Sequence, residues 1–292
     1  MSAQVDSAAA GAPLLRRKRT RLPFLVLCAI VCLAAVVLVT AFAQWLQPQP
    51  YTEQDLFQQL DPPLLYGGTT KHVLGTDDLG RDVLSRLLVG TQVSVLIAMT
   101  GTAIGAVLGV LIGMLAAHLR GWFDEATMML VDAQTALPFI VFALAILAFF
   151  GGSVWLLVLI IGINGWERYA RLTRGLVFGM QSSELMTALR SLGFATPRIY
   201  WRHILPNIAG VLVIQFTVNL PAAILLETSL SFLGIGIQPP MTSLGQMLGQ
   251  GRDYLVSGWW VAVMPGMMIF LITVSISILG DWLRDYLDPT LK

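Results

Sequence analysis

Charged residues are scarce in this sequence. Only 12% of the 292 residues are Asp, Glu, Lys or Arg, whereas 56% are hydrophobic. A soluble domain usually carries about 25% charged residues, so the polar surface that a water-soluble fold of this length needs is missing. The composition therefore predicts an integral membrane protein. The formal net charge of +1 gives no indication of nucleic-acid binding.

Residues that bind metals or form disulfides are also few. The two cysteines, Cys28 and Cys32, lie on one face of a single apolar segment. Their spacing within a helix forms no sound disulfide, and two thiols alone make a poor metal site. The three histidines are scattered, and no phosphate-binding loop, G-x-S-x-G or H-E-x-x-H motif is present. We expect a chain that binds no metal or cofactor itself and has no catalytic site.

Long apolar runs are abundant, and each is long enough to cross a hydrocarbon core of about 30 Å as a helix. We expect an all-α membrane protein with about six spans, at residues 23–46, 93–117, 126–150, 154–169, 207–233 and 261–280. Residues 41–43 also resemble a signal-peptide cleavage site. The first apolar run is longer than the roughly 7–15 residues of a signal core, which favours a retained helix.

An even number of spans places both ends of the chain on one side. The basic run at residues 16–21 makes that side the cytoplasm, and most of the 18 basic residues then lie there. The predicted organisation is a basic cytoplasmic tail (1–22), a first transmembrane helix (23–46), an extracytoplasmic loop (47–92), a transmembrane core (93–280) with a cytoplasmic loop (167–206), and a cytoplasmic C-terminal tail (281–292).

Small residues form a regular stripe on the second predicted span. Gly101, Gly105, Gly109 and Gly113 recur every four residues, so they lie on one face of the helix. Such a stripe lets a neighbouring backbone approach closely, and we interpret it as a site of helix packing rather than a ligand path.

Polar residues inside the spans are candidates for function. Asp132 and Glu227 lie in apolar surroundings where a carboxylate is expensive. Structural and functional roles are both open for them, and a catalytic role for the pair would make the chain an intramembrane hydrolase. Gln215 and Asn219 share a face of the fifth span and, with Glu227, are candidate pathway residues. Interhelical hydrogen bonding is the alternative role.

The cytoplasmic loop contains two predicted short helices. Residues 182–193 form an amphipathic pattern that ends at Gly193, a residue suited to the left-handed C-terminal position. A second helix is expected at residues 198–205, with its end at Pro206. The apolar side of this pair needs a partner protein, or else it lies on lipid headgroups.

Four segments resemble motifs of one known family, and they follow one another along the chain in the order that the family has. Residues 187–193 with 202–207 resemble the EAA loop of ABC importer permeases, and residues 72–86, 230–240 and 280–289 resemble segments of the dipeptide/oligopeptide/nickel permeases. The overall similarity is to the C-type permease of dipeptide and oligopeptide importers. Thr187 stands where that family usually has glutamate, which removes a charge-assisted hydrogen bond.

The resemblance implies particular site residues. Those of the loop that couples to an ATPase are Glu184, Leu185, Thr187, Ala188, Leu189, Arg190, Gly193, Ile204, Leu205 and Pro206. Those of the extracytoplasmic motif, in a loop expected to face a binding protein, are Leu74, Gly75, Thr76, Asp77, Gly80, Arg81 and Asp82.

The resemblance also implies a type I ABC importer permease in the bacterial inner membrane. Its expected partners are a second, B-type permease, two cytoplasmic ATPases that use ATP and Mg, an extracytoplasmic binding protein and a peptide substrate. Uptake of nickel or a metal chelate is the alternative within the family. The absence of a His, Cys and Met cluster in the spans favours peptide.

Overall fold

The computed structural model describes residues 23–287, with the exception of the side chains of Leu185, Thr187 and Arg190. The predicted tail 1–22 and the last residues of the C-terminal motif lie outside this part. In chain order its helices are α1 (Phe24–Leu46), η1 (Leu56–Gln58), η2 (Leu64–Tyr66), α2 (Val83–Leu119), α3 (Gly121–Ala136), α4 (Phe139–Phe150), α5 (Val154–Gln181), α6 (Glu184–Ser191), α7 (Thr196–Ile199), η3 (Tyr200–Ile204), α8 (Leu205–Phe232), α9 (Leu244–Gly251), η4 (Arg252–Tyr254) and α10 (Trp260–Leu287).

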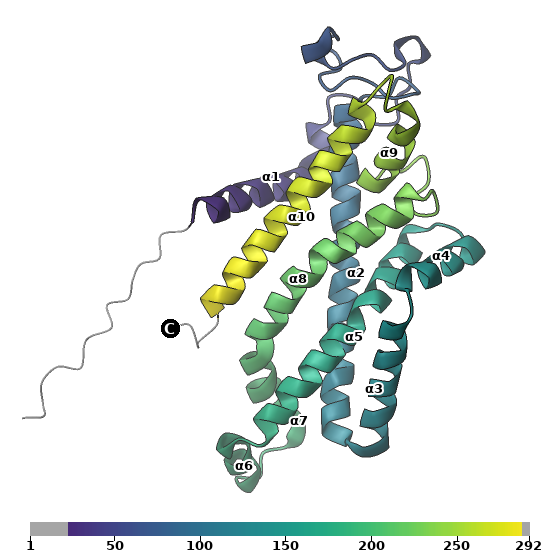
Figure 1. Cartoon of the computed structure of the whole chain (residues 1–292). Coiled ribbons are helices and arrows are strands. Elements are labelled where there is room, and N and C mark those ends of the chain that lie inside the picture. The colour runs from purple at the N-terminus through teal and green to yellow at the C-terminus, as the bar shows by residue number, and fades with distance from the viewer. Residues whose placement is uncertain (1–22, 288–292) are drawn as a thin grey trace, which may run out of the picture.

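The long helices form a bundle whose two ends differ (Figure 1). α2 runs through the bundle, with α5, α8 and α10 beside it. The loop that carries η1 and η2 covers one end together with α9, and α6 and α7 project from the other. By the predicted orientation, the first end is extracytoplasmic and the second is cytoplasmic.

The predicted all-helical membrane fold is confirmed. Four helical stretches are long and apolar enough to cross a membrane, namely α1, α2, the continuous stretch Thr196–Phe232 and α10. The bent pair of α3 and α4 is a fifth if it counts as one span. α5 is the remaining expected span. Its second half carries several charges, so length and composition alone do not identify it, and the number six stays a prediction.

The span expected over residues 126–150, with Asp132 and Pro138 as interruptions, is broken at the proline. The chain forms α3 and α4 instead, which meet at an angle of 86°. Pro138 has no N–H to continue a helical ladder, and proline pushes the residue before it towards extended backbone. Leu137 accordingly lies at φ −98° and ψ 141°.

Two other helices extend beyond the predicted spans. α2 begins at Val83 rather than at residue 93, because the Asp82 side chain caps it by accepting a 2.8 Å hydrogen bond from the Ser85 N–H. α5 continues to Gln181, so residues 167–181 of the predicted cytoplasmic loop are helical. An apolar run indicates only the part of a helix that crosses lipid. The helix can continue beyond that run for as long as its backbone N–H and C=O groups find hydrogen-bond partners.

Pro206 does not end a helix, contrary to the expectation for the second loop helix. α7, η3 and α8 follow one another without a break, and Pro206 lies in the first turn of α8. η3 is a π-helical turn in which the Leu205 N–H bonds to the Tyr200 carbonyl. The wider turn lets the helix continue past a residue that has no N–H.

The glycine stripe of α2 lies directly against the backbone of α5. A Cβ placed on Gly105, Gly109 or Gly113 would lie 2.6, 2.3 or 2.5 Å from a carbonyl oxygen of α5, and one on Gly101 would lie 2.6 Å from the Ile161 side chain. Only glycine permits this approach. The close contact fixes α5 along α2 and so positions the charged second half of α5.

Candidate functional site

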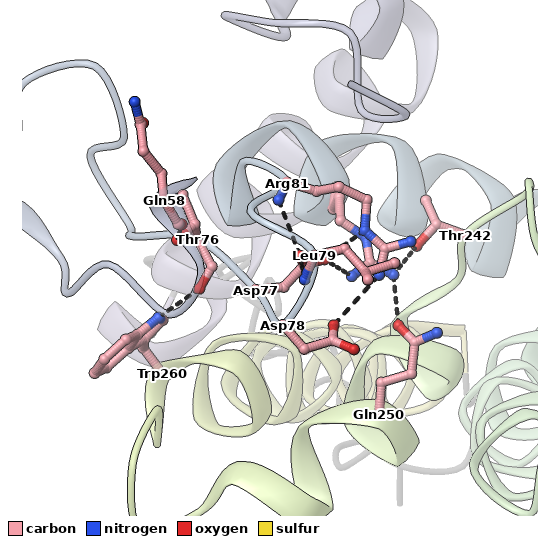
Figure 2. Close-up of polar contacts among 10 residues, drawn as sticks. Gln58, Thr76, Asp77, Asp78, Leu79, Arg81, Thr242, Gln250 and Trp260 are labelled. Atoms are coloured by element: carbon pink, nitrogen blue, oxygen red, sulfur yellow. Dashed lines mark hydrogen bonds and ion pairs between the residues drawn. The ribbon is translucent and has the colours of Figure 1, made fainter. Parts of the chain in front are cut away.

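The extracytoplasmic motif forms a buried polar network around Asp77, which is fully buried (Figure 2). One carboxylate oxygen, Oδ1, accepts the backbone N–H groups of Leu79 and Arg81, both at 2.9 Å. The other, Oδ2, accepts Arg81 Nε at 2.7 Å and also a guanidinium N–H of Arg86. The Asp77 carboxylate thus closes the turn and pairs with two arginines, and Asp78 Oδ1 lies 3.5 Å from Arg81 Nη2 as a second acidic partner.

Arg86 connects this network to a distant part of the chain. Its Nη2 donates to Gln250 Oε1 at 2.8 Å and lies 3.5 Å from Thr242 Oγ1. The indole N–H of Trp260 donates to the carbonyl of Thr76 at 3.0 Å (Figure 2). Through these bonds the outer loop is tied to α2, to the segment before α9 and to α10.

The other motif residues serve the same loop. Asp82 accepts from Ser85 and lies 3.1 Å from the His72 ring, and Gly80 has a left-handed φ of 70°. A Cβ on Gly80 would lie 1.8 Å from the Asp55 carbonyl oxygen, so glycine is required there. The seven predicted motif residues are buried or half-buried, namely Leu74, Gly75, Thr76, Asp77, Gly80, Arg81 and Asp82. They build the loop rather than form its outer surface.

The outer surface of the loop comes from other side chains. Leu56 and Phe57 of η1 and Leu65 and Tyr66 of η2 are all more than 60% exposed. The loop also borders a polar cavity of about 360 Å³ lined by Arg81, Arg86, Thr242, Gln246 and neighbouring loop residues.

Glu227, the third predicted pathway residue, does not line the cavity that Gln215 borders. It is fully buried in α8, where its Oε1 accepts a 2.7 Å hydrogen bond from the Ser231 hydroxyl. Ser231 in turn accepts the N–H of Ile237 at 3.2 Å. These contacts give Glu227 a structural place at the junction of α8 with the segment that leads to α9.

The structure does not bring Asp132 and Glu227 together. Asp132 is on α3, where it forms a 2.5 Å ion pair with Arg171 of α5, and its side chain is 71% exposed. Glu227 is fully buried, with Ser231 of α8, Ser94 of α2 and Ser243 before α9 as its polar neighbours. Two carboxylates in such separate surroundings do not form an aspartyl-type catalytic pair. Within residues 23–287, no three His, Cys, Asp or Glu side chains gather as a metal site either.

Gln215 and Asn219 meet the charged half of α5. Asn219 Oδ1 accepts hydrogen bonds from Arg168 at 3.0 Å and from Gln215 at 3.1 Å. Gln215 and Arg168 also line a cavity of about 400 Å³ between α3, α5 and α8, together with Val131, Thr135, Glu167, Arg171 and Leu172. Most of the side chains at this cavity are polar or charged, although most of its exposed surface is apolar. Polar groups of this kind within a membrane-spanning bundle are candidates for a substrate path.

Sequence reasoning did not single out Arg168 as a pathway residue. Arg168, Arg171 and Arg174 were counted as cytoplasmic loop residues, although all three belong to α5. Their spacing of three residues could have indicated a helix, because it places the three arginines next to one another on one helical surface.

The predicted coupling loop forms a knob with its own small core. Met186 and Leu189 of α6 are buried against Val177 of α5 and against Ile199 and Ile204. The expectation that the apolar side of α6 awaits a partner was therefore wrong for these residues. Apolar side chains of α5, α7 and η3 in the same chain cover this side of α6.

A different surface of the knob is exposed. Glu184, Ala188, Leu192 and Gly193 face outward, and the Leu192 side chain is 73% exposed. Gly193 has a φ of 78°, and the Phe194 N–H bonds back to the Leu189 carbonyl at 3.2 Å, which closes the helix. The predicted contacts of the Leu185, Thr187 and Arg190 side chains lie outside the described residues.

The knob is joined to the bundle by polar contacts as well. Gln181, the last residue of α5, accepts from Arg120 at 2.7 Å and donates to the Tyr200 hydroxyl at 2.8 Å. Arg174 of α5 forms an ion pair with Asp124 of α3. Polar contacts at Gln181 and the apolar core around Met186 thus join the knob to the bundle.

Comparisons with known proteins agree with this architecture. Residues 109–292 match the family model described as binding-protein-dependent transport system inner membrane component. The chain is 40% identical over 258 residues to the di/tripeptide transport system permease protein DppC of Pseudomonas aeruginosa, which covers 88% of this chain and 85% of that protein. The chain belongs to this permease family.

Other relatives extend the match. A putative peptide transport system permease of Brucella suis is 38% identical over 96% of this chain and 90% of its own length. The glutathione transport system permease protein GsiD of Pectobacterium atrosepticum is 36% identical over 88% of this chain and 85% of its own length. In fold, the chain resembles the inward-facing MetNI methionine ABC transporter, with a TM-score of 0.56 at 18% identity over 70% of this chain and 98% of that chain.

Family membership fixes the general role. The chain is a multi-pass transmembrane permease subunit of an ABC importer, and it is a transport component rather than an enzyme. Such permeases work with an ATPase and with a substrate-binding protein. The expectation of a separate energy source thus agrees with the family. Nickel uptake is not favoured by these relatives.

Proposed function

We propose that this chain is the permease of a peptide importer in the bacterial inner membrane. In this proposal it forms a translocation path with a second, B-type permease for peptides that an extracytoplasmic binding protein delivers. The observation that carries the proposal is the 40% identity with a di/tripeptide permease over 88% of the chain. The charged and amide side chains around the cavity between α3, α5 and α8 suit a polar substrate.

The exposed side of α6 is the proposed contact with a cytoplasmic ATPase. Two ATPase subunits, which use ATP and Mg, would each grip one permease knob. The buried Met186 and Leu189 join the knob firmly to α5 and to the start of α8. A displacement of the knob is therefore transmitted to the helices that carry Arg168 and Asn219, at the proposed path.

The outer loop is the proposed contact with the binding protein. Leu56, Phe57, Leu65 and Tyr66 present apolar surface away from the bundle. Exposed apolar groups of this kind on a polar loop are typical of protein contacts. Asp77 and the buried network beneath them hold the loop in one conformation, which lowers the entropic cost of docking.

The test is transport by the reconstituted complex of both permeases, the ATPases and the binding protein. We expect ATP-dependent uptake of a labelled dipeptide into proteoliposomes. Leu192→Asp places a charge on the exposed knob surface and should reduce ATPase association and uptake at least tenfold, a loss of about 1.4 kcal/mol in binding. Membrane insertion should persist, because the Leu192 side chain is 73% exposed.

A matched control separates the knob from a general effect of charge. Trp122 is 78% exposed in the first turn of α3, at the same end of the bundle. Trp122→Asp should leave ATPase association and uptake near the wild-type level. Unchanged uptake in Leu192→Asp would refute the coupling surface. Absence of peptide uptake by the wild-type complex would refute the proposed cargo.

A further inference from the structure

Three arginines on α5 have different partners. Arg171 binds the Asp132 carboxylate at 2.5 Å, and Arg174 binds the Asp124 carboxylate, so both are neutralised by α3. Arg168 has no carboxylate partner on another helix among the described residues. Its one interhelical hydrogen bond is to the amide oxygen of Asn219 on α8, at 3.0 Å.

The carboxylate nearest to Arg168 is already engaged. Glu167 Oε1 lies 3.5 Å from Arg168 Nε, a long contact between adjacent residues. The Glu167 side chain is 6% exposed, and its Oε2 accepts a 3.1 Å hydrogen bond from Gln134 of α3. Adjacent residues on a helix project about 100° apart, so Glu167 does not cover Arg168. The Arg168 side chain accordingly stays 47% exposed, at the cavity between α3, α5 and α8.

Asn219 adds a buried donor beside Arg168. Its Oδ1 accepts from both Arg168 and Gln215, so Nδ2 is the other end of the amide. Asn219 is only 5% exposed, and its amide lies near the buried hydroxyl of Tyr169. Neither Asn219 Nδ2 nor Tyr169 Oη forms a hydrogen bond of ordinary geometry among the described residues. A donor that is only weakly engaged is available to a polar ligand beside Arg168.

These observations describe a surplus of donors. The Arg168 guanidinium has five N–H groups in a planar fork, and the amides of Gln215 and Asn219 add further N–H groups beside it. A planar fork that is not neutralised across an interface is suited to bind a carboxylate through two parallel hydrogen bonds. In surroundings of low dielectric constant such a contact is stronger than in water.

We infer that Arg168, supported by Asn219 and Gln215, binds the C-terminal carboxylate of the peptide as it passes through the path. This inference rests on the proposed function, since it assigns a contact to that path. Arg168 is half exposed, so the contact is weak enough to release the cargo, as a path requires.

The experiment compares two cargoes in the reconstituted complex. One is a labelled dipeptide with a free C-terminal carboxylate, and the other is its C-terminal amide, chosen from pairs that the binding protein binds. The measured quantity is the ratio of their uptake rates. The same binding protein serves every permease variant, so its own preference cancels when ratios are compared.

We expect Arg168→Gln to lower the ratio of free to amidated uptake about tenfold, which corresponds to about 1.4 kcal/mol. Asn219→Asp provides a second, isosteric variant, because its carboxylate would occupy Arg168 and lower the ratio in the same direction. Arg252→Gln is the control. Arg252 is also partly exposed beside the carboxylate of an adjacent residue, at 3.2 Å from Asp253, but it lies at the outer end. In Arg252→Gln, the ratio of free to amidated uptake should equal that of the wild type.

Other outcomes overturn the inference. If Arg168→Gln slows both cargoes equally, Arg168 binds a lipid phosphate or an acid of the second permease, or supports the fold. An unchanged ratio in both Arg168→Gln and Asn219→Asp also refutes the contact. If the wild-type complex transports neither cargo, the proposed function fails instead, which the ratio experiment distinguishes from failure of the inferred contact.

Discussion

Asp77→Asn is expected to open the outer loop, because it replaces the carboxylate oxygen that binds the two arginines and keeps the other one. An asparagine keeps an oxygen for the two backbone N–H groups of Leu79 and Arg81, which bond to Oδ1. Its amide nitrogen replaces Oδ2 and presents a donor to the guanidinium groups of Arg81 and Arg86. The fold of the turn is thus preserved while both ion pairs are lost.

The magnitude follows from burial. Arg86 is 2% exposed and would keep only Gln250 and Thr242 as partners. Breaking a buried ion pair by removing one partner costs about 3–5 kcal/mol, because an uncompensated charge stays buried. The control is Asp253→Asn, which breaks the Arg252–Asp253 pair with side chains 60% and 68% exposed. An exposed pair contributes about 0.2–1 kcal/mol.

The assay is amide hydrogen exchange of residues 47–82 in nanodiscs, followed by mass spectrometry. A cost of 3 kcal/mol or more in local opening corresponds to exchange roughly 100-fold faster. Adding Arg86→Met to Asp77→Asn should restore part of the protection, since it removes the unpaired charge. The reasoning is refuted if Asp77→Asn exchanges within about threefold of the wild type, or if Asp253→Asn opens the loop equally.

Two further predictions concern the interior of the bundle. Gly109→Ala places a Cβ 2.3 Å from the Trp166 carbonyl oxygen, so we expect about 1–3 kcal/mol of overpacking, partly offset by about 1 kcal/mol of helix propensity. Gly175→Ala meets nothing within 4 Å and should not lower the thermal stability of the complex; an equal loss in both variants would contradict this. Glu227→Gln should retain stability and uptake, because the amide oxygen can still accept the Ser231 hydroxyl, whereas Glu227→Ala loses about 1–3 kcal/mol. Loss of uptake in Glu227→Gln with assembly intact would show that the carboxylate itself is required.

Several elements of the fold were predictable because their signals are local. The apolar runs identify α1, α2, α8 and α10, since lipid solvates each helix independently of its neighbours. The four-residue glycine period indicates a packing face from a single helix. The turn at Gly193 follows from the left-handed backbone that glycine favours at a helix end.

The candidate site was less predictable, because its residues meet across large separations. Gln215 and Asn219 were identified from their shared face, but their partner Arg168 lies 51 residues before Asn219 and was assigned to a cytoplasmic loop. Arg86 and Gln250 are 164 residues apart. Nothing in the local pattern of either segment specifies such a pair.

The sequence by itself determined the membrane class, most spans and the family motifs, because hydrophobicity and motif spacing are properties of short segments. Only the tertiary structure decided which motif residues are buried and which side chains they contact. Thr76 and Asp77 are buried inside the outer loop, and Met186 and Leu189 form part of the core of the knob. Glu227 is buried away from the cavity between α3, α5 and α8. The physical reason is that burial and hydrogen bonding depend on which helices pack together. The close packing of α5 on the glycines of α2 is one such contact, and it exists only in the assembled bundle.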